Sequence, residues 1–229
     1  MQRLRLGILQ VNHDTSDDIG NGFPDDAHRF RDLFDALDQR FTYRVYMTIG
    51  GELPAHPDEQ DAFLITGSPL SVLDDLAWKE GLFAFIRACD IARKPLLGCC
   101  FGHQAIAMAL GGRVDRGDWN VGVETAHFDQ GDLPLYVFHQ DQVTALPPET
   151  RGIAHSAACP HAGFAKGTHI LTTQAHPEFT PGFMAALVDK YGVLLGDEAL
   201  SKTHDSLTQQ AKGHVFAQWA ADFFSGKWL

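Results

Sequence analysis

The sequence predicts an α/β fold built on a mostly parallel sheet. Three observations support this prediction. Apolar runs that end at turns alternate with amphipathic segments up to Gly112, short extended pieces follow, and two amphipathic segments close the chain. Alternating strands and helices are typical of a parallel sheet covered by helices on both faces.

The first half of the chain begins this alternation. The run "LRLGILQV" predicts a buried strand, and the polar stretch "NHDTSDDIGNGFPDD" predicts a loop after it. A helix is expected from Asp26, because four apolar side chains follow at helical spacing: Phe30, Leu33, Phe34 and Leu37. The segment "YRVYMTI" predicts the next strand.

Two further pairs of strand and helix follow. "DAFLITGSP" is an apolar run that ends at a turn, and "DDLAWKEGLFAFIRACDIARK" predicts a helix with aspartates at its start and basic residues at its end. We expect Asp74 and Asp75, like Asp25 and Asp26 before them, to start helices rather than to act as catalytic carboxylates. "PLLGC" and "HQAIAMAL" predict another strand and helix.

The second half predicts added, mostly antiparallel strands and two closing helices. The strand candidates are "VGVETAHF", "LPLYVFHQ", "RGIAHSA", "GFAKG" and "HILTTQA", and the helix candidates are "PGFMAALVDKYG" and "GHVFAQWAADFFSG". No internal repeat or linker divides the chain, so a single domain over residues 1–229 is expected.

Composition excludes several classes of function. The net charge of −11 without a cluster of basic residues argues against a nucleic-acid partner. No apolar stretch reaches the roughly 18 residues that a membrane span needs. The chain has four cysteines, Cys89, Cys99, Cys100 and Cys159. They could form too few disulfides to stabilise 229 residues, which favours a reducing, cytoplasmic location.

The adjacent cysteines in "PLLGCCFGHQ" occupy the predicted turn from strand to helix. Side chains alternate along a strand, so Cys99 is expected in the core and Cys100 in the turn. Gly98 and Gly102 let strand and helix approach each other around a strained residue, as in a nucleophile elbow. The helix N-terminus favours a thiolate, and the N–H of Phe101 points toward a developing oxyanion. Cys100 is therefore the predicted nucleophile; the alternative is two inert, apolar cysteines.

A thiolate that attacks an amide also needs a proton donor for the departing amine. The stretch "TTQAHPEF" supplies a candidate in His176. Pro177 biases His176 toward extended backbone, and residues two apart in an extended run share a side, so the Glu178 carboxylate can reach the imidazole. The alternative is an exposed turn without a catalytic role.

These residues resemble the motifs of the class I glutamine amidotransferases, which carry Gly-x-Cys-x-Gly-x-Gln at the elbow and His-Pro-Glu near the end of the glutaminase domain. Both motifs are present in this order: Gly98, Cys100, Gly102 and Gln104, then His176, Pro177 and Glu178. The resemblance covers nearly all of the chain up to His-Pro-Glu. It implies a flavodoxin-like, doubly wound, mostly parallel sheet with catalysis at the carboxyl ends of its strands.

The resemblance also implies a triad and a thioester intermediate. Cys100 attacks a γ-glutamyl amide, while His176, oriented by Glu178, protonates the leaving amine and then activates water. The implied oxyanion and substrate groups are the N–H groups of Phe101 and of the Thr66–Ser68 turn with Gly67 and Ser68, the Gln104 side chain, and His139, Gln140 and Asp141 in "FHQDQVTALP". The turn reads Gly-Ser-Pro where the family has Gly-Gly-Pro, which leaves open which N–H points inward.

The expected substrate is a small molecule, glutamine or another γ-glutamyl compound. The chain ends at residue 229 without a synthetase domain, so we expect either a synthetase partner that accepts ammonia or a simple hydrolase. "TGSP" and "CFGHQ" also resemble stand-alone γ-glutamyl peptidases. An alternative from another class is a non-catalytic redox-sensing or binding module in which Cys100 is oxidised reversibly.

No cofactor or metal is expected. Four potential ligands crowd one region, but their spacing fits no zinc pattern: His155, Cys159, His161 and His169.

Overall fold

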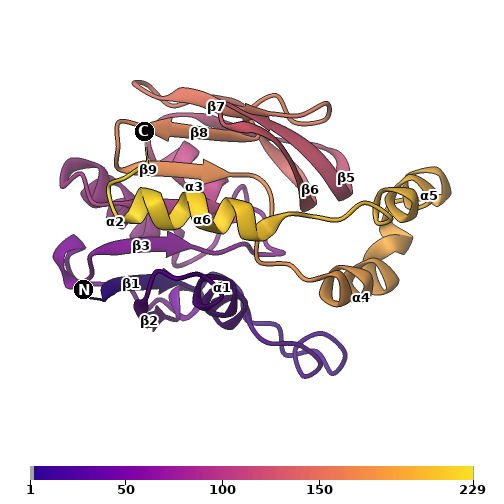
Figure 1. Ribbon diagram of the computed structural model, residues 1–229, viewed down its shortest axis with the longest axis horizontal. Coiled ribbons are helices and arrows are strands. Elements are labelled where there is room, and N and C mark those ends of the chain that lie inside the picture. Colours follow the sequence, from indigo (N-terminus) through magenta and orange to yellow (C-terminus); the bar gives the residue numbers. More distant parts are fainter. Residues whose placement is uncertain (1–2, 229) are drawn as a thin grey trace.

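The computed structural model describes residues 3–228, and within them the strands form one mixed sheet (Figure 1). Its order is β2-β1-β3-β4-β9-β8-β7-β5-β6. The strands are β1 (Leu4–Leu9), β2 (Phe41–Tyr46), β3 (Ala62–Ile65), β4 (Leu96–Cys99), β5 (Arg113–Phe128), β6 (Gly131–Ala145), β7 (Arg151–His155), β8 (Gly163–Lys166) and β9 (Ile170–Thr173).

The sheet has a parallel half and an antiparallel half that meet at β9. Strands β2, β1, β3, β4 and β9 run parallel to one another, with Cys99 of β4 in register with Thr173 of β9. Strands β8, β7, β5 and β6 continue the sheet with antiparallel pairs. The predicted flavodoxin-like α/β fold with added antiparallel strands is confirmed.

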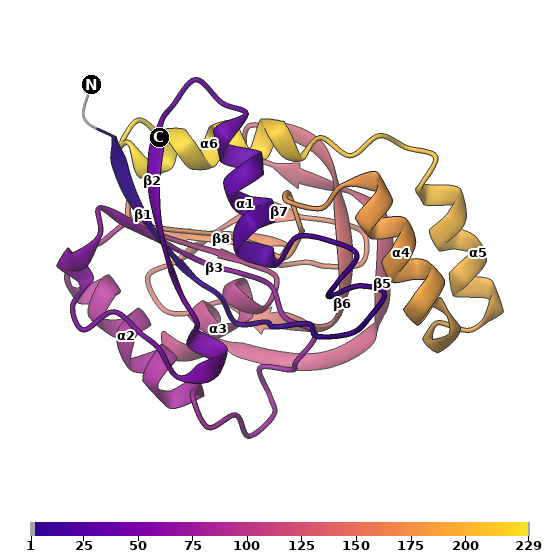
Figure 2. The same ribbon diagram turned by 90° about the horizontal axis from the view of Figure 1, so that it is seen from below.

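Helices cover both faces of the parallel half (Figure 2). The helices are α1 (Asp26–Asp35), α2 (Lys79–Ile91), α3 (Phe101–Ala109), α4 (Pro181–Tyr191), α5 (Asp197–Ser206) and α6 (Gly213–Phe224), with short 3₁₀ turns η1 (Thr48–Gly50), η2 (Pro57–Glu59) and η3 (Gly192–Leu194). Helices α1 and α6 share one apolar cluster, in which Phe34 packs edge-on against Phe224. Helices α2 and α3 pack in a second cluster on the opposite face.

One helix begins later than the sequence predicted, and one helix was not predicted. Asp25 caps α1 as expected, since its side chain accepts the N–H of His28. Asp74, in contrast, lies in a turn where its carboxylate accepts the N–H of Ser71, and α2 begins only at Lys79. Asp74 and Asp75 therefore do not start that helix, and the expectation for them was wrong. Helix α5 was not predicted.

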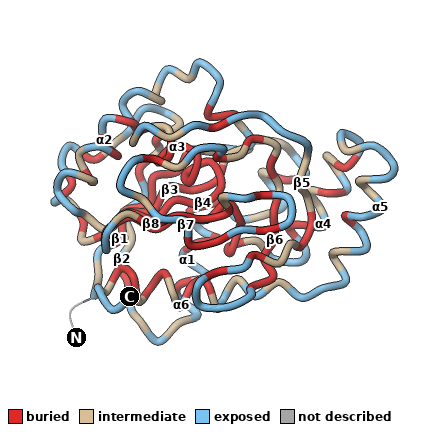
Figure 3. The backbone as a smooth tube through the Cα atoms, turned by 90° about the horizontal axis from the view of Figure 1, so that it is seen from above, coloured by how far each residue is buried: buried red, intermediate tan, exposed pale blue. Residues whose placement is uncertain are grey.

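Burial is concentrated in the central strands (Figure 3). Strands β3, β4 and β9 are buried along their whole length. No helix within residues 3–228 is long and apolar enough to cross a membrane. The segments that follow β1, β3, β4 and β9 all leave the carboxyl ends of neighbouring parallel strands, so their side chains gather at one edge of the sheet.

Candidate active site

Cys100 occupies a strained turn between β4 and α3. Its backbone has φ 49° and ψ −106°, a left-handed φ that a residue with a Cβ rarely adopts. A Cβ on Gly98 would lie 2.6 Å from the carbonyl carbon of Gly102, and one on Gly102 would lie 2.4 Å from the Ile65 oxygen. Both glycines are therefore needed for this close approach, and the turn has the mechanics of a nucleophile elbow.

The two adjacent cysteines face different surroundings. Cys99 is fully buried in the apolar cluster beneath α1 and α6, and burial raises the pKa of its thiol well above the ordinary value. Cys100 lines a cavity at the edge of the sheet. Strand alternation thus separates a core cysteine from one that a substrate can reach.

The His-Pro-Glu segment follows β9 and is anchored to β6. The His176 N–H donates to the Tyr136 carbonyl at 2.8 Å, which places this segment beside the elbow. The imidazole Nδ1 lies 2.8 Å from Glu178 Oε1, and both side chains are buried. The ring of Phe179 stacks on the imidazole with centroids 3.9 Å apart. The ring is thus held on one edge and one face, which leaves Nε2 available to Cys100.

Charge stabilises the protonated imidazole. Burial alone would lower the pKa of His176, but the charges of Cys100 and Glu178 and hydrogen bonds to both outweigh burial and raise this pKa to about 10. At neutral pH the imidazole is therefore a cation between a sulfur and a carboxylate. This arrangement places a proton donor beside the sulfur.

Gly67 marks the point where the imidazole and the sulfur-bearing residue converge. A Cβ at Gly67 would lie 2.6 Å from Cε1 of His176 and 3.6 Å from Cβ of Cys100. Any side chain here would displace the imidazole. The turn itself is tied to α3, because the Gly102 N–H donates to the Thr66 carbonyl at 3.2 Å.

The backbone N–H groups that are predicted to stabilise an oxyanion lie near Gly67. Phe101 is the first residue of α3, so its N–H belongs to the first turn, whose donors lack partners within the helix, and its ring packs against Trp78. Gly67 and Ser68 both line the cavity. The Ser68 hydroxyl accepts the N–H of Leu70 at 3.2 Å, which turns this side chain back toward its own loop.

Polar side chains of α3 and β6 form one end of the cavity. The Gln104 amide nitrogen donates to the Asp141 carbonyl at 2.8 Å, so this side chain supports β6 as well as lining the cavity. His139 donates from Nδ1 to the same carbonyl at 3.2 Å. Burial lowers the pKa of His139 to about 4, so its imidazole is neutral at neutral pH. Gln140 lines the cavity beside them.

The sequence comparison that decides the family agrees with this geometry. A family model described as glutamine amidotransferase class-I matches residues 42–190. The chain belongs to the class I glutamine amidotransferase family. It is 29% identical to gamma-glutamyl peptidase 2 of Arabidopsis thaliana over 188 residues, which cover 74% of this chain and 76% of that protein.

Two further comparisons fit the same family. The chain is 32% identical to the GMP synthase [glutamine-hydrolyzing] of Aromatoleum aromaticum over 136 residues, 51% of this chain and 25% of that protein. The crystal structure of a glutamine amido transferase from Methylobacillus flagellatus superposes with a TM-score of 0.75 and 22% identity, covering 99% of this chain and 94% of that one. This superposition shows a shared fold.

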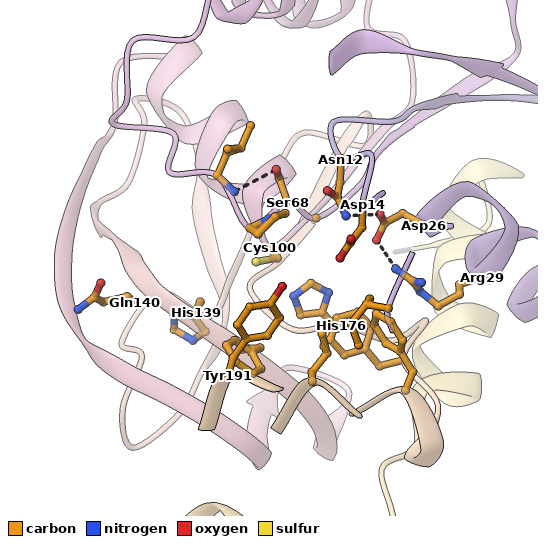
Figure 4. A pocket seen from close by; sticks show the side chains of 18 of the residues that line it. Asn12, Asp14, Asp26, Arg29, Ser68, Cys100, His139, Gln140, His176 and Tyr191 are labelled. Atoms are coloured by element: carbon orange, nitrogen blue, oxygen red, sulfur yellow. Dashed lines mark hydrogen bonds and ion pairs between the residues drawn. The ribbon is translucent and has the colours of Figure 1, made fainter. Parts of the chain in front are cut away.

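The cavity extends beyond the residues that the sequence predicted for the site (Figure 4). Its volume is about 310 Å³. The loop after β1 and the start of α1 supply Asn12, Asp14, Asp26 and Arg29, and α4 supplies aromatic and aliphatic side chains. None of these was predicted as a site residue, because no short motif joins the loop, α1 and α4.

The crowded histidines around residue 160 have structural contacts. His169 is buried, and its Nε2 lies 2.8 Å from Asp90 Oδ1. Cys159 is buried, and its N–H donates to Ser156 Oγ. Within residues 3–228 no group of three or more His, Cys, Asp or Glu residues is arranged to hold a metal ion.

Proposed function

We propose that this chain hydrolyses a γ-glutamyl amide by thioester chemistry, with Cys100, His176 and Glu178 as its catalytic triad. The observation that carries the proposal is the convergence of Cys100 and the His176 imidazole at Gly67, with Glu178 on the far nitrogen of the ring. Relatives named for γ-glutamyl peptidase and glutamine-hydrolysing activity support this substrate class.

In the first half-reaction the Cys100 thiolate attacks the γ-carbonyl carbon. The N–H groups of Phe101 and of the Gly67–Ser68 turn stabilise the oxyanion. The His176 imidazolium donates its Nε2 proton to the leaving nitrogen, the C–N bond breaks, and a γ-glutamyl thioester remains on the sulfur.

In the second half-reaction a water molecule takes the place of the amine. Neutral His176 removes a proton from this water, which attacks the thioester carbonyl. The C–S bond breaks, glutamate leaves, and the thiolate and imidazolium are restored. Glu178 holds Nδ1 throughout and stabilises the imidazolium.

The glutamyl moiety occupies the polar end of the cavity. Its α-amino and carboxylate groups face the backbone and side chains of His139, Gln140 and Asp141, and Gln104 holds this segment in place. Neutral His139 contributes hydrogen bonding rather than charge.

We further propose that residues 1–229 form one domain and that it acts in the cytoplasm, consistent with four buried, unpaired cysteines. The amine product leaves into solvent. Co-purification of the chain with a synthetase that consumes ammonia would instead assign it as an amidotransferase subunit.

The decisive test compares two neighbouring cysteines. Glutamate release from glutamine and from γ-glutamyl amides is measured for the wild type, Cys100→Ala and Cys99→Ala. The wild type and Cys99→Ala are expected to turn over substrate, while Cys100→Ala shows none and keeps its circular dichroism spectrum. Turnover by Cys100→Ala would overturn the proposal.

A further inference from the structure

The part of the cavity beside His176 decides which amines can leave. His176 must deliver its proton to the leaving nitrogen, so the leaving substituent extends on the imidazole side of Cys100, away from His139 and Gln140. Figure 4 places Asp14, Asp26 and Arg29 on this side. We call this part of the cavity, lined by the 12–29 segment and α4, the amine side.

Aromatic and aliphatic side chains form the wall of the amine side. Phe179, Phe183 and Leu187 of the α4 region line it, together with Phe23 from the loop. The rings are packed against one another, with Phe23 5.3 Å and Phe179 4.8 Å from Phe183 between centroids. The wall is therefore a preformed apolar surface and not a set of exposed, mobile side chains.

The cavity is also larger than glutamine requires. Its volume of about 310 Å³ corresponds to room for roughly ten water molecules. An unsubstituted carboxamide would leave the apolar wall in contact with water. A substituent on the amide nitrogen would cover it and gain the free energy of apolar burial.

The charged groups of the amine side disfavour a carboxylate. Arg29 is already paired with Asp26 at 2.6 Å, and both are buried. Its guanidinium also lies 3.8 Å over the Phe183 ring. Arg29 is thus committed to protein partners and is not free to bind an anionic group of a substrate.

Asp14 adds a negative charge that Lys190 offsets only in part. Its Oδ1 accepts the Ser16 N–H at 2.8 Å, and hydrogen bonds to Ser16 outweigh burial and lower the pKa of Asp14. Lys190, whose charge acts on Asp14, is paired with Asp18 at 2.6 Å. Figure 4 shows the Asp14 side chain directed toward the space before His176.

From this lining we infer that the enzyme prefers γ-glutamyl derivatives of apolar amines that carry no carboxylate, over both glutamine and γ-glutamyl amino acids. This inference rests on the proposed function, because it assigns the leaving group of the same reaction. The apolar wall selects against ammonia as the leaving group, and Asp14 selects against an α-amino acid.

A matched pair of substrates tests the inference. γ-Glutamyl-phenethylamide and γ-glutamyl-phenylalanine differ only in the carboxylate of the leaving group. The expected kcat/KM is at least about tenfold higher for the phenethylamide, because a like-charge pair near a protein surface has a cost of this order. It should also exceed the value for glutamine.

Variants test which residues cause the preference between leaving groups. Asp14→Asn is expected to reduce the difference in kcat/KM between γ-glutamyl-phenethylamide and γ-glutamyl-phenylalanine. Leu187→Ser is expected to lower the ratio of kcat/KM for γ-glutamyl-phenethylamide to kcat/KM for glutamine. Two matched controls should leave both ratios unchanged: Asp17→Asn, in the same loop, and Val193→Ser, in η3, where the side chain is 82% exposed.

The outcomes separate the inference from the proposed function. Equal cleavage of the matched pair, or faster cleavage of γ-glutamyl-phenylalanine or glutamine, overturns the inference and leaves γ-glutamyl hydrolysis standing. An unchanged gap in Asp14→Asn overturns the role of that carboxylate. Failure to cleave any γ-glutamyl amide overturns both.

Discussion

The contribution of Glu178 to catalysis can be tested with an isosteric change, Glu178→Gln. The carboxylate is fully buried, and Oε1 lies 2.8 Å from His176 Nδ1, while Oε2 has no hydrogen-bond partner within the described residues. The substitution keeps the shape and removes the charge. A hydrogen bond to a charged group contributes about 1.5–3 kcal/mol, which corresponds to about 1 to 2 pH units.

The pH dependence gives the sign of this effect. The pKa of His176 is raised from 6.5 to about 10, so the imidazolium persists at neutral pH and is lost as the pH rises through 10. The alkaline limb of kcat/KM is therefore expected near pH 10 in the wild type and about 1 to 2 units lower in Glu178→Gln, with kcat/KM about 10- to 100-fold lower at neutral pH.

A stability measurement provides a second readout. Because the pKa of His176 is raised on folding, its stabilising contribution is complete below pH 6.5 and declines as the pH rises to about 10. This decline in the free energy of unfolding should be smaller in Glu178→Gln. Superimposable pH–rate profiles for the two proteins would refute the role assigned to Glu178.

Three further substitutions test the surroundings of His176. Gly67→Ala places a Cβ 2.6 Å from the His176 imidazole and should lower kcat about 100-fold. The control Gly182→Ala, which has open space around its Cβ, should keep the wild-type kcat. Equal activities of the two variants would contradict the steric argument. Phe179→Leu removes the ring stacked at 3.9 Å and should lower kcat severalfold in steady-state kinetics with glutamine, whose leaving group carries no substituent to contact this ring. Gln104→Leu removes the donor that supports β6 and should raise KM about tenfold; a pure loss of kcat would point to a different role.

The parts of the structure that the sequence predicted depend on local patterns. The elbow can be predicted from the sequence because the alternation of side chains in β4 and the glycines Gly98 and Gly102 all lie within five residues of Cys100. The proximity of His176 and Glu178 is equally local, but it arises in a turn, in which the Phe179 N–H donates to the His176 carbonyl, and not in the extended run that the sequence predicted. The alternation of apolar strands with amphipathic helices likewise predicts the layers of the sheet.

The parts that were missed depend on polar surfaces or on long-range packing. Helix α5 has one buried residue, Thr203, so it offers no apolar stripe that would distinguish it from a loop. Helix α2 begins later than expected because Asp74 forms a turn with Ser71. Asp14 and Arg29 enter the cavity only because α1 packs beside the His-Pro-Glu segment, which no pattern near either residue encodes.

The most direct test concerns the covalent bond that the sulfur of Cys100 is proposed to form with the γ-carbonyl carbon of the substrate. A glutamine analogue that carries an electrophilic γ-chloroketone in place of the carboxamide reacts irreversibly with such a thiolate. After incubation, peptide mapping by mass spectrometry should locate one label on Cys100 and none on Cys99, with labelling lost in His176→Ala. Labelling of another residue, or a wild-type protein that stays unlabelled while it turns over a γ-glutamyl amide, would contradict the account.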